Sequence, residues 1–160
     1  MKMMVMSRSD ARRYSFKDIP KTIIISIASI DEDKNKFADN DNIIDILYLF
    51  FDDVEKNEPN HITVDDANKI IAFVNKYKDS DVELIVHCGA GVSRSAGVCA
   101  AIMKIVNGND FSIFDNPRFC PNMTCYRTIL ETYFGAYDEE AAAANEQHNI
   151  DIWTKLFEEE

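Results

Sequence analysis

Residues 81–108, DVELIVHCGAGVSRSAGVCAAIMKIVNG, contain the change of pattern that decides the fold. The first eight residues are a short apolar run, which predicts a buried strand over 81–88. Small and apolar residues then predict a helix over 95–108, which Gly108 ends. A cysteine, two glycines and an arginine lie at the junction, and a simple turn would need neither the cysteine nor the arginine.

The preceding sequence supplies further elements of the same kind. Runs rich in β-branched residues predict strands over 21–29 and 41–51. A helix is expected to begin at Thr63, because Asp66 stands three residues later and completes a capping-box pattern. Strands that alternate with helices in this order indicate a parallel sheet with helices packed against it.

The C-terminal part of the sequence predicts two more helices, over 123–134 and 138–157. In the second of these, Ile150, Trp153 and Leu156 are expected to be the apolar contacts. The fold class that follows is α/β. We expect one domain over residues 1–160, with a central, mostly parallel sheet flanked by helices and a phosphate-binding loop between a strand and a helix.

Composition and charge limit the possible surroundings and partners. The 160 residues are 46% hydrophobic and 28% charged, which is typical of a soluble globular domain. The first residues have no apolar core of signal-peptide length, and four cysteines without tight pairing suit a reducing compartment, so a cytoplasmic location is predicted. The net charge of −11 argues against nucleic-acid and membrane partners. Residues 84–130 nevertheless carry four basic and two acidic side chains, a net +2 that permits an anion site.

The junction between strand and helix has the chemistry of such a site. Gly89 and Gly91 allow the backbone to curl so that successive N–H groups point inward at the start of a helix. The helix dipole and Arg94 would stabilise Cys88 as a thiolate, the nucleophilic form of cysteine. The Arg94 guanidinium can bind two phosphate oxygens in parallel. A nucleotide-binding P-loop, GxxxxGK[ST], is absent from the sequence.

His87, Cys88, Gly91, Arg94 and Ser95 together match the pattern HCxxGxxR[ST]. The chain therefore resembles the cysteine-dependent protein tyrosine phosphatases and, by its size, their compact dual-specificity branch. The resemblance is strong over 82–107 and looser over 41–135. It implies that Cys88 is the nucleophile, that His87 supports the loop by hydrogen bonding, and that Ser95 stabilises the departing thiolate. It also implies that phosphate is bound by Gly89, Ala90, Gly91, Val92, Ser93 and Arg94, without metal or organic cofactor.

The resemblance further implies a general acid on an upstream loop. FDDVEKNE, residues 51–58, follows a predicted strand and favours Asp53 as the acid, with Asp52 as its rival. Asn122 occupies a stretch in which related phosphatases often have an asparagine that braces the phosphate loop. The three other cysteines are interpreted as structural: Cys99, Cys120 and Cys125.

Several alternatives stay open at this stage. Cys88 could be a small buried hydrophobe and Ser95 a helix cap. The preferred substrate is a phosphoprotein or phosphopeptide, with phosphotyrosine favoured and phosphoserine or phosphothreonine admitted. The other functions considered are hydrolysis of phosphoinositides or RNA 5′-phosphates, phosphate binding without catalysis, and rhodanese-type sulfur transfer, which needs no upstream acid. The sequence does not fix the oligomeric state, with which a monomer is compatible.

Overall fold

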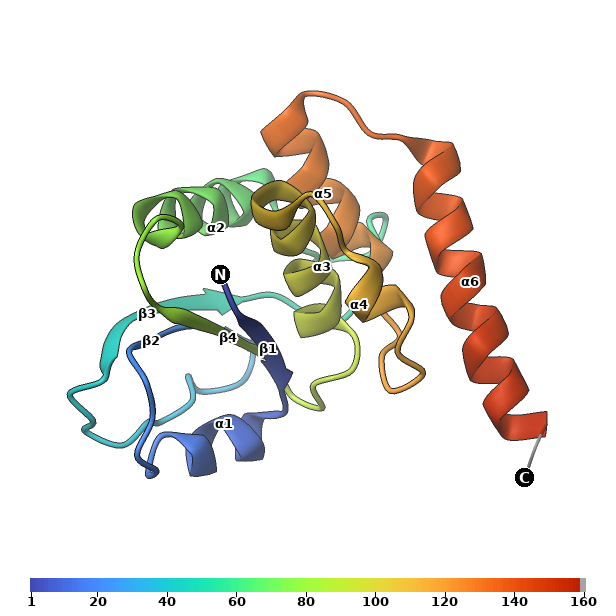
Figure 1. The fold of residues 1–160 in the computed structure, drawn as a ribbon. Helices are drawn as coiled ribbons and strands as arrows, with labels where there is room; N and C mark the ends of the chain where they lie inside the picture. The colour runs from blue at the N-terminus through green and yellow to red at the C-terminus, as the bar shows by residue number, and fades with distance from the viewer. Residues whose placement is uncertain (159–160) are drawn as a thin grey trace.

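Four parallel strands form the central sheet of the computed structural model, which describes residues 1–158 (Figure 1). Their order across the sheet is β1-β4-β2-β3. The strands are β1 (Met3–Met6), β2 (Thr22–Ala28), β3 (Ile43–Phe50) and β4 (Glu83–His87). All seven residues of β2 are buried, because this strand pairs with β3 on one side and β4 on the other. The predicted α/β class is confirmed, and every described strand pair is parallel.

Helices cover the sheet unequally. In Figure 1, α2, α3 and α5 lie over one face, α1 lies on the opposite side, and α6 stands at one edge. The helices are α1 (Arg8–Tyr14), α2 (Val64–Tyr77), α3 (Arg94–Asn107), α4 (Phe111–Phe114), α5 (Met123–Phe134) and α6 (Glu139–Glu158). As predicted, Thr63 caps α2 in a capping box with Asp66, and Gly108 ends α3 with a left-handed conformation, at φ 72°.

The sequence pattern did not predict β1, α1 or α4. β1 has only four residues, too few for a periodic pattern, and becomes a strand because it pairs in parallel with β4 along Met3–Met6. Met6 lies opposite His87, so this edge strand ends beside the loop that follows β4. Within residues 1–158, no helix has the length and apolarity needed to cross a membrane.

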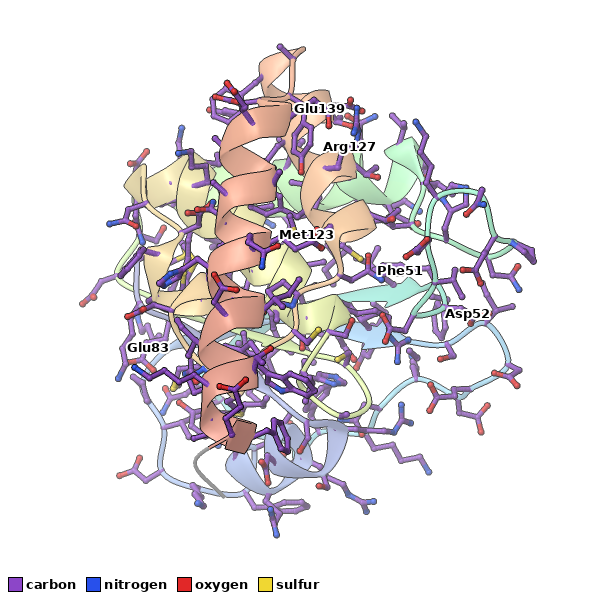
Figure 2. All side chains as sticks on the ribbon, turned by 90° about the vertical axis from the view of Figure 1, so that its right-hand side faces the viewer. Phe51, Asp52, Glu83, Met123, Arg127 and Glu139 are labelled. Atoms are coloured by element: carbon purple, nitrogen blue, oxygen red, sulfur yellow. The ribbon has the colours of Figure 1, made fainter. Side chains whose placement is uncertain are left out.

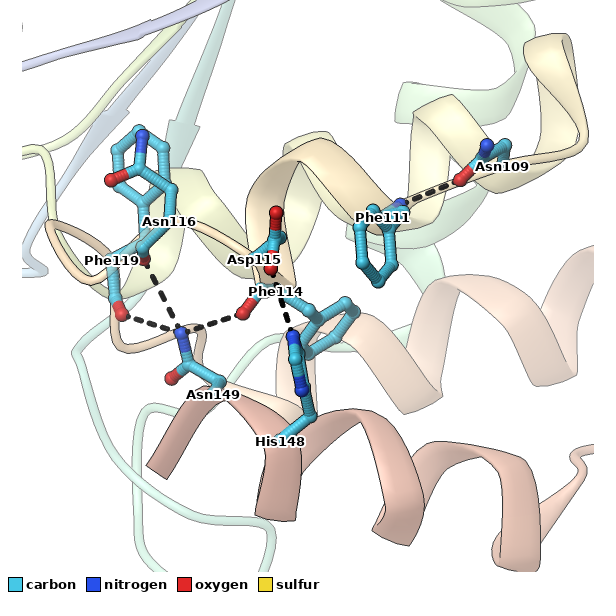
Figure 3. Close-up of polar contacts among 8 residues, drawn as sticks. All are labelled: Asn109, Phe111, Phe114, Asp115, Asn116, Phe119, His148 and Asn149. Carbon is cyan, nitrogen blue, oxygen red and sulfur yellow. Dashed lines mark hydrogen bonds and ion pairs between the residues drawn. The ribbon is translucent and has the colours of Figure 1, made fainter. Parts of the chain in front are cut away.

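The helix α6 is attached through polar contacts to the segment around α4 (Figure 3). The buried Asn149 side chain donates to the carbonyl oxygens of Phe114 and Phe119, at 3.2 and 3.0 Å, and His148 Nε2 lies 2.9 Å from Asp115 Oδ1. An asparagine buried in this way satisfies several backbone acceptors at once.

The predicted helix over 138–157 is confirmed, but its predicted apolar contacts are wrong. Ile150 is 44% exposed, and Trp153 and Leu156 are each 46% exposed. The buried residues of α6 are Ala142 and Asn149, both before these side chains, so the helix runs on past its contacts with the body of the fold. An apolar stripe on a helix indicates burial only where another element packs against it.

Candidate active site

The β4–α3 loop, Cys88–Ser93, lies at the carboxyl end of β4, the edge of a parallel sheet at which ligands bind. Three of its carbonyl oxygens accept hydrogen bonds of 2.9–3.0 Å from the backbone of other segments: Arg8 N to Gly89 O, Cys120 N to Val92 O and Asn122 N to Ser93 O. Within residues 1–158, the N–H groups of 89–93 donate to no protein acceptor. The loop therefore presents free backbone donors beside a helix N-terminus, which is the chemistry of an anion cradle.

Two glycines let neighbouring segments approach this loop. Gly91 has a φ of 72°, and a Cβ there would lie 2.5 Å from Ser7 N and 2.6 Å from the Met6 carbonyl carbon. A Cβ at Gly97, in the first turn of α3, would collide with the backbone carbonyl oxygen of Asn122. The segments that follow β1 and precede α5 thus pack directly on the backbone of the loop and its helix.

Cys88, the first residue of the loop, and Ser95, in α3, have side chains in contact. Cys88 Sγ and Ser95 Oγ are 3.0 Å apart, and both residues are buried, at 3% and 0% exposure. Ser95 is the second residue of α3, and the N-cap position is held by Ser93. The alternative of Ser95 as a helix cap is therefore excluded. Its hydroxyl can donate a hydrogen bond to a thiolate at Cys88.

Arg94 begins α3 and is buried, with 7% of its surface exposed. Its Nη1 donates to Ser29 Oγ at 3.0 Å and to Phe51 O at 2.9 Å, so the guanidinium is anchored to the segments after β2 and β3. A Cβ at Gly89 would lie 3.4 Å from Arg94 Nη2, which places the other side of the guanidinium next to the loop. Anchoring one nitrogen in this way leaves the opposite edge of the fork for two oxygens of an anion.

His87 lies beneath the loop with no exposed surface. Its Nδ1 is 3.1 Å from Cys88 O and its Nε2 is 2.6 Å from Ser26 Oγ. Because a carbonyl oxygen only accepts, Nδ1 is the donor, and Nε2 of the neutral ring accepts from the Ser26 hydroxyl. Burial lowers the pKa of His87, which favours this neutral form. The ring fixes the backbone at Cys88, in keeping with the supporting role that the resemblance implies.

Asp53 lies on the β3–α2 loop (51–63) and contacts the β4–α3 loop directly. Its Oδ1 accepts hydrogen bonds from Ser93 Oγ at 2.8 Å and from Asn122 Nδ2 at 2.9 Å. Both donors reach the same oxygen, which leaves Oδ2 without a partner among the described residues. The exposed Asp53 carboxyl group is therefore held at the rim of the loop with one oxygen unoccupied.

Asp52 has a different environment. Its Oδ1 accepts from the backbone N–H of Ile30 at 3.0 Å, and its Oδ2 accepts from Asn60 Nδ2 at 3.2 Å. Both carboxylate oxygens are thus used to join the segment after β2 to the β3–α2 loop. This arrangement gives Asp52 a structural task and favours Asp53 in the choice between the two acids.

Asn122 connects the two loops and caps a helix. Its Nδ2 donates to Asp53 Oδ1 and also to Val54 O, at 3.2 Å. Its Oδ1 accepts from Cys125 N at 3.0 Å, so the same side chain is the N-cap of α5. The expectation that Asn122 braces this region agrees with the geometry, and the brace extends to the loop that carries Asp53.

The remaining cysteines fall into two groups. Cys99 and Cys125 are buried, and burial raises the pKa of both thiols, that of Cys99 to about 12. Such thiols stay protonated, in agreement with their interpretation as structural residues. Cys120 is exposed, so the prediction that it is structural is wrong for its side chain. Its backbone N–H, which bonds to Val92 O, is what contributes to the loop.

Sequence reasoning missed three supports of the site. Ser26, within β2, binds His87, and Ser29, directly after β2, binds Arg94. The Met6–Ser7 backbone packs on Gly91. A serine within a strand that is otherwise apolar was a usable signal, because a buried hydroxyl needs a partner. The contact from Met6 and Ser7 involves only their backbone atoms, so the amino-acid types at these two positions could not have revealed it.

Solved structures, but neither family profiles nor curated proteins, resemble this chain. No protein-family profile and no curated protein matches the chain. The crystal structure of human tyrosine phosphatase-like serine/threonine/tyrosine-interacting protein is 17% identical and superposes with a TM-score of 0.53 over 95% of this chain and 93% of that one. A variant of human DUSP28 is 13% identical with a TM-score of 0.50, covering 99% and 93%. PTPMT1 in complex with PI(5)P is 15% identical with a TM-score of 0.47, covering 97% and 94%. The chain has the fold of the compact dual-specificity phosphatases.

Proposed function

We propose that this chain is a cysteine-dependent phosphatase that hydrolyses phosphotyrosine in proteins, with phosphoserine and phosphothreonine as further substrates. The observation that carries the proposal is the convergence of four groups on one loop: the Cys88 thiol, the Ser95 hydroxyl beside it, the anchored Arg94 guanidinium and the Asp53 carboxyl group at the rim. A binding module would need the cradle and the arginine but neither the thiol nor the acid.

The chemistry proceeds in two displacements. The Cys88 thiolate attacks phosphorus, the bond between phosphorus and the leaving oxygen breaks, and Asp53 donates its proton to that oxygen. Oδ2 is the Asp53 oxygen that carries the proton, since Oδ1 already accepts two hydrogen bonds. Loop N–H groups and Arg94 stabilise the charge on the equatorial oxygens.

The second displacement regenerates the enzyme. Asp53, now a carboxylate, takes a proton from water as the water oxygen attacks phosphorus, and the sulfur–phosphorus bond breaks. The departing thiolate accepts a hydrogen bond from Ser95 Oγ, 3.0 Å away. Inorganic phosphate leaves and both residues return to their starting states, so the cycle needs neither a metal nor an organic cofactor.

Substrate class follows from the loop composition. None of the residues at 89–93 is basic, whereas the extra phosphates of an inositol headgroup would require neutralisation there. This favours phosphoproteins over phosphoinositides and RNA 5′-phosphates. One structural neighbour is described as phosphatase-like and as an interacting protein, and phosphate binding without catalysis is the corresponding alternative here.

Hydrolysis of p-nitrophenyl phosphate by the wild-type chain and by Cys88→Ser tests the proposal. We expect turnover by the wild type and none by Cys88→Ser, while the variant still binds vanadate or phosphate because the cradle and Arg94 are intact. Equal turnover by the two proteins would exclude Cys88 as the nucleophile. Wild-type protein that binds phosphate without hydrolysing any ester would establish the binding module instead.

A further inference from the structure

A groove of about 950 Å³ begins at the candidate active site and runs toward α6. Asp53 and Ser93, which meet at the rim of the β4–α3 loop, form one end of it, and Glu146 on α6 belongs to the other. Figure 2, in which α6 faces the viewer, shows Met123 and Arg127 between this helix and the segment where Phe51 and Asp52 follow β3. The groove therefore continues from the candidate general acid to a separate part of the surface.

The charge of the groove is opposite to that of the cradle. Five acidic side chains line it: Asp53, Glu55, Glu58, Glu139 and Glu146. Its basic residues are Lys56 and Arg127, and Arg127 already forms ion pairs with Glu131 at 3.1 Å and with Glu139 at 2.5 Å. Among the described residues, Glu55, Glu58 and Glu146 form no ion pair and are exposed.

When a phosphorylated peptide is bound at Cys88, the residues that flank its phosphorylated side chain must run across the surface beside the site. An extended chain advances about 3.3 Å per residue, so residues two to four positions from the phosphorylated side chain lie roughly 7–13 Å away. That is comparable with the screening length of about 8–10 Å at physiological salt, within which exposed charges act on one another. On the side of Asp53 and Ser93, that surface is the acidic groove. Its carboxylates attract lysine or arginine on the peptide and repel glutamate.

We infer that the groove between the β3–α2 loop and α6 binds the flanking segment of the substrate, and that it selects phosphopeptides with lysine or arginine two to four residues from the phosphorylated residue on one side. This inference rests on the proposed function and names its substrate class. Glu55, Glu58 and Glu146 supply the selectivity, while the Arg94 cradle holds the phosphate. The site thus recognises two opposite charges a short distance apart on one peptide.

The test compares kcat/KM on four phosphotyrosine peptides of equal length. One has three arginines on the N-terminal flank, one has them on the C-terminal flank, one has glutamates on both flanks and one has alanines. We expect one of the two arginine peptides to exceed the alanine peptide by roughly threefold to tenfold at low salt, the range for a few exposed charge pairs. The advantage should shrink at high salt, and the glutamate peptide should be the poorest.

Two charge reversals on α6 distinguish an effect of the groove from an effect of the net charge of the protein. Glu146→Lys changes a residue of the groove, whereas Glu140→Lys makes the same change at an exposed position of α6 outside it. The ratio of kcat/KM between the favoured arginine peptide and the glutamate peptide should fall at least threefold in Glu146→Lys and stay at its wild-type value in Glu140→Lys.

The outcomes distinguish the inference from the function on which it rests. Equal rates on all four peptides, a preference for glutamate, or equal effects of the two reversals would overturn the groove as a specificity site while leaving the phosphatase in place. A wild-type chain that hydrolyses neither the peptides nor p-nitrophenyl phosphate would overturn both.

Discussion

The β4–α3 loop and the β3–α2 loop meet at the candidate active site, yet they are held in different ways. The first is fixed by backbone hydrogen bonds from Arg8, Cys120 and Asn122 and lies above a buried histidine. The second is exposed at Asp53 and is held there by side-chain hydrogen bonds from Ser93 and Asn122. From this difference we expect the β4–α3 loop to be rigid, as suits a phosphate-binding loop. We expect the β3–α2 loop, which carries the candidate acid, to be the more mobile of the two.

Removal of the acid should have the largest effect among the changes that test this difference. Asp53→Ala is expected to lower kcat on esters with poor leaving groups by roughly 10²–10⁴, the usual contribution of general acid catalysis. The loss should shrink for p-nitrophenyl phosphate, whose leaving group needs little protonation. The measurement is a series of kcat values on aryl phosphates of increasing leaving-group pKa.

Asp52→Ala is the matched control for that series. Because Asp52 bonds to Ile30 and Asn60 rather than to the cradle, its loss should destabilise the β3–α2 loop without changing the dependence of kcat on the leaving group. If Asp52→Ala showed the steeper dependence and Asp53→Ala did not, the assignment of the two acids would be reversed.

The cradle can be tested through its anchored cation. Arg94→Lys should lower kcat/KM by about 10²–10³, since one ammonium replaces a fork that is positioned by Ser29 and Phe51. Ser29→Ala, which removes one of those two anchors and keeps the guanidinium, should cost less than tenfold. Comparable losses in the two variants would mean that positioning, and not the fork itself, supplies most of the effect.

The same contrast explains what could be predicted from the sequence. The residues from His87 to Ser95 are contiguous, so their pattern, together with the flanking strand and helix, predicts a phosphate-binding loop at this position. Asp52 and Asp53 are adjacent acids, and local pattern cannot distinguish them. They differ through partners such as Asn60 and Asn122, the latter 69 residues from Asp53, and only the folded chain brings these together.

The errors have a related cause. β1 is defined by its pairing with β4, and four residues are too few to reveal it. Ile150 and Trp153 are apolar and periodic, but their exposure depends on whether another segment covers α6, which the pattern of the helix itself does not record. Local periodicity therefore predicts the longer strands and helices, whereas contacts between distant segments decide the short elements and the exposure of side chains.

The link between the two loops is expected to make a smaller contribution than either the acid or the cation. Asn122→Ala removes both the donor to Asp53 and the N-cap of α5, whereas Asn122→Asp keeps a capping oxygen and loses the donor. We expect kcat on poor leaving groups to fall about two- to tenfold in both variants, the equivalent of one hydrogen bond. Only Asn122→Ala should also lose about 1 kcal/mol of stability in a urea titration. Full activity in Asn122→Asp would show that the asparagine caps the helix and does not position the acid.

The smallest expected effect concerns the floor of the cradle and appears in stability rather than in turnover. Burial lowers the pKa of His87 in the folded state, so between the folded and unfolded pKa values the unfolded chain binds more protons than the folded one. The contribution of neutral His87 is therefore fully present above its ordinary pKa of 6.5 and is lost as the pH falls below that value toward the folded pKa. Urea titrations between pH 7.5 and 5 should show the free energy of unfolding decreasing with acid, and His87→Gln, which cannot titrate, should flatten part of that slope. NMR titration of the ring provides the direct measurement. If His87 protonated at or above its ordinary pKa in the folded chain, its ring would not be the neutral one placed between Cys88 O and Ser26 Oγ. The view that this histidine holds the β4–α3 loop rigid would then be wrong.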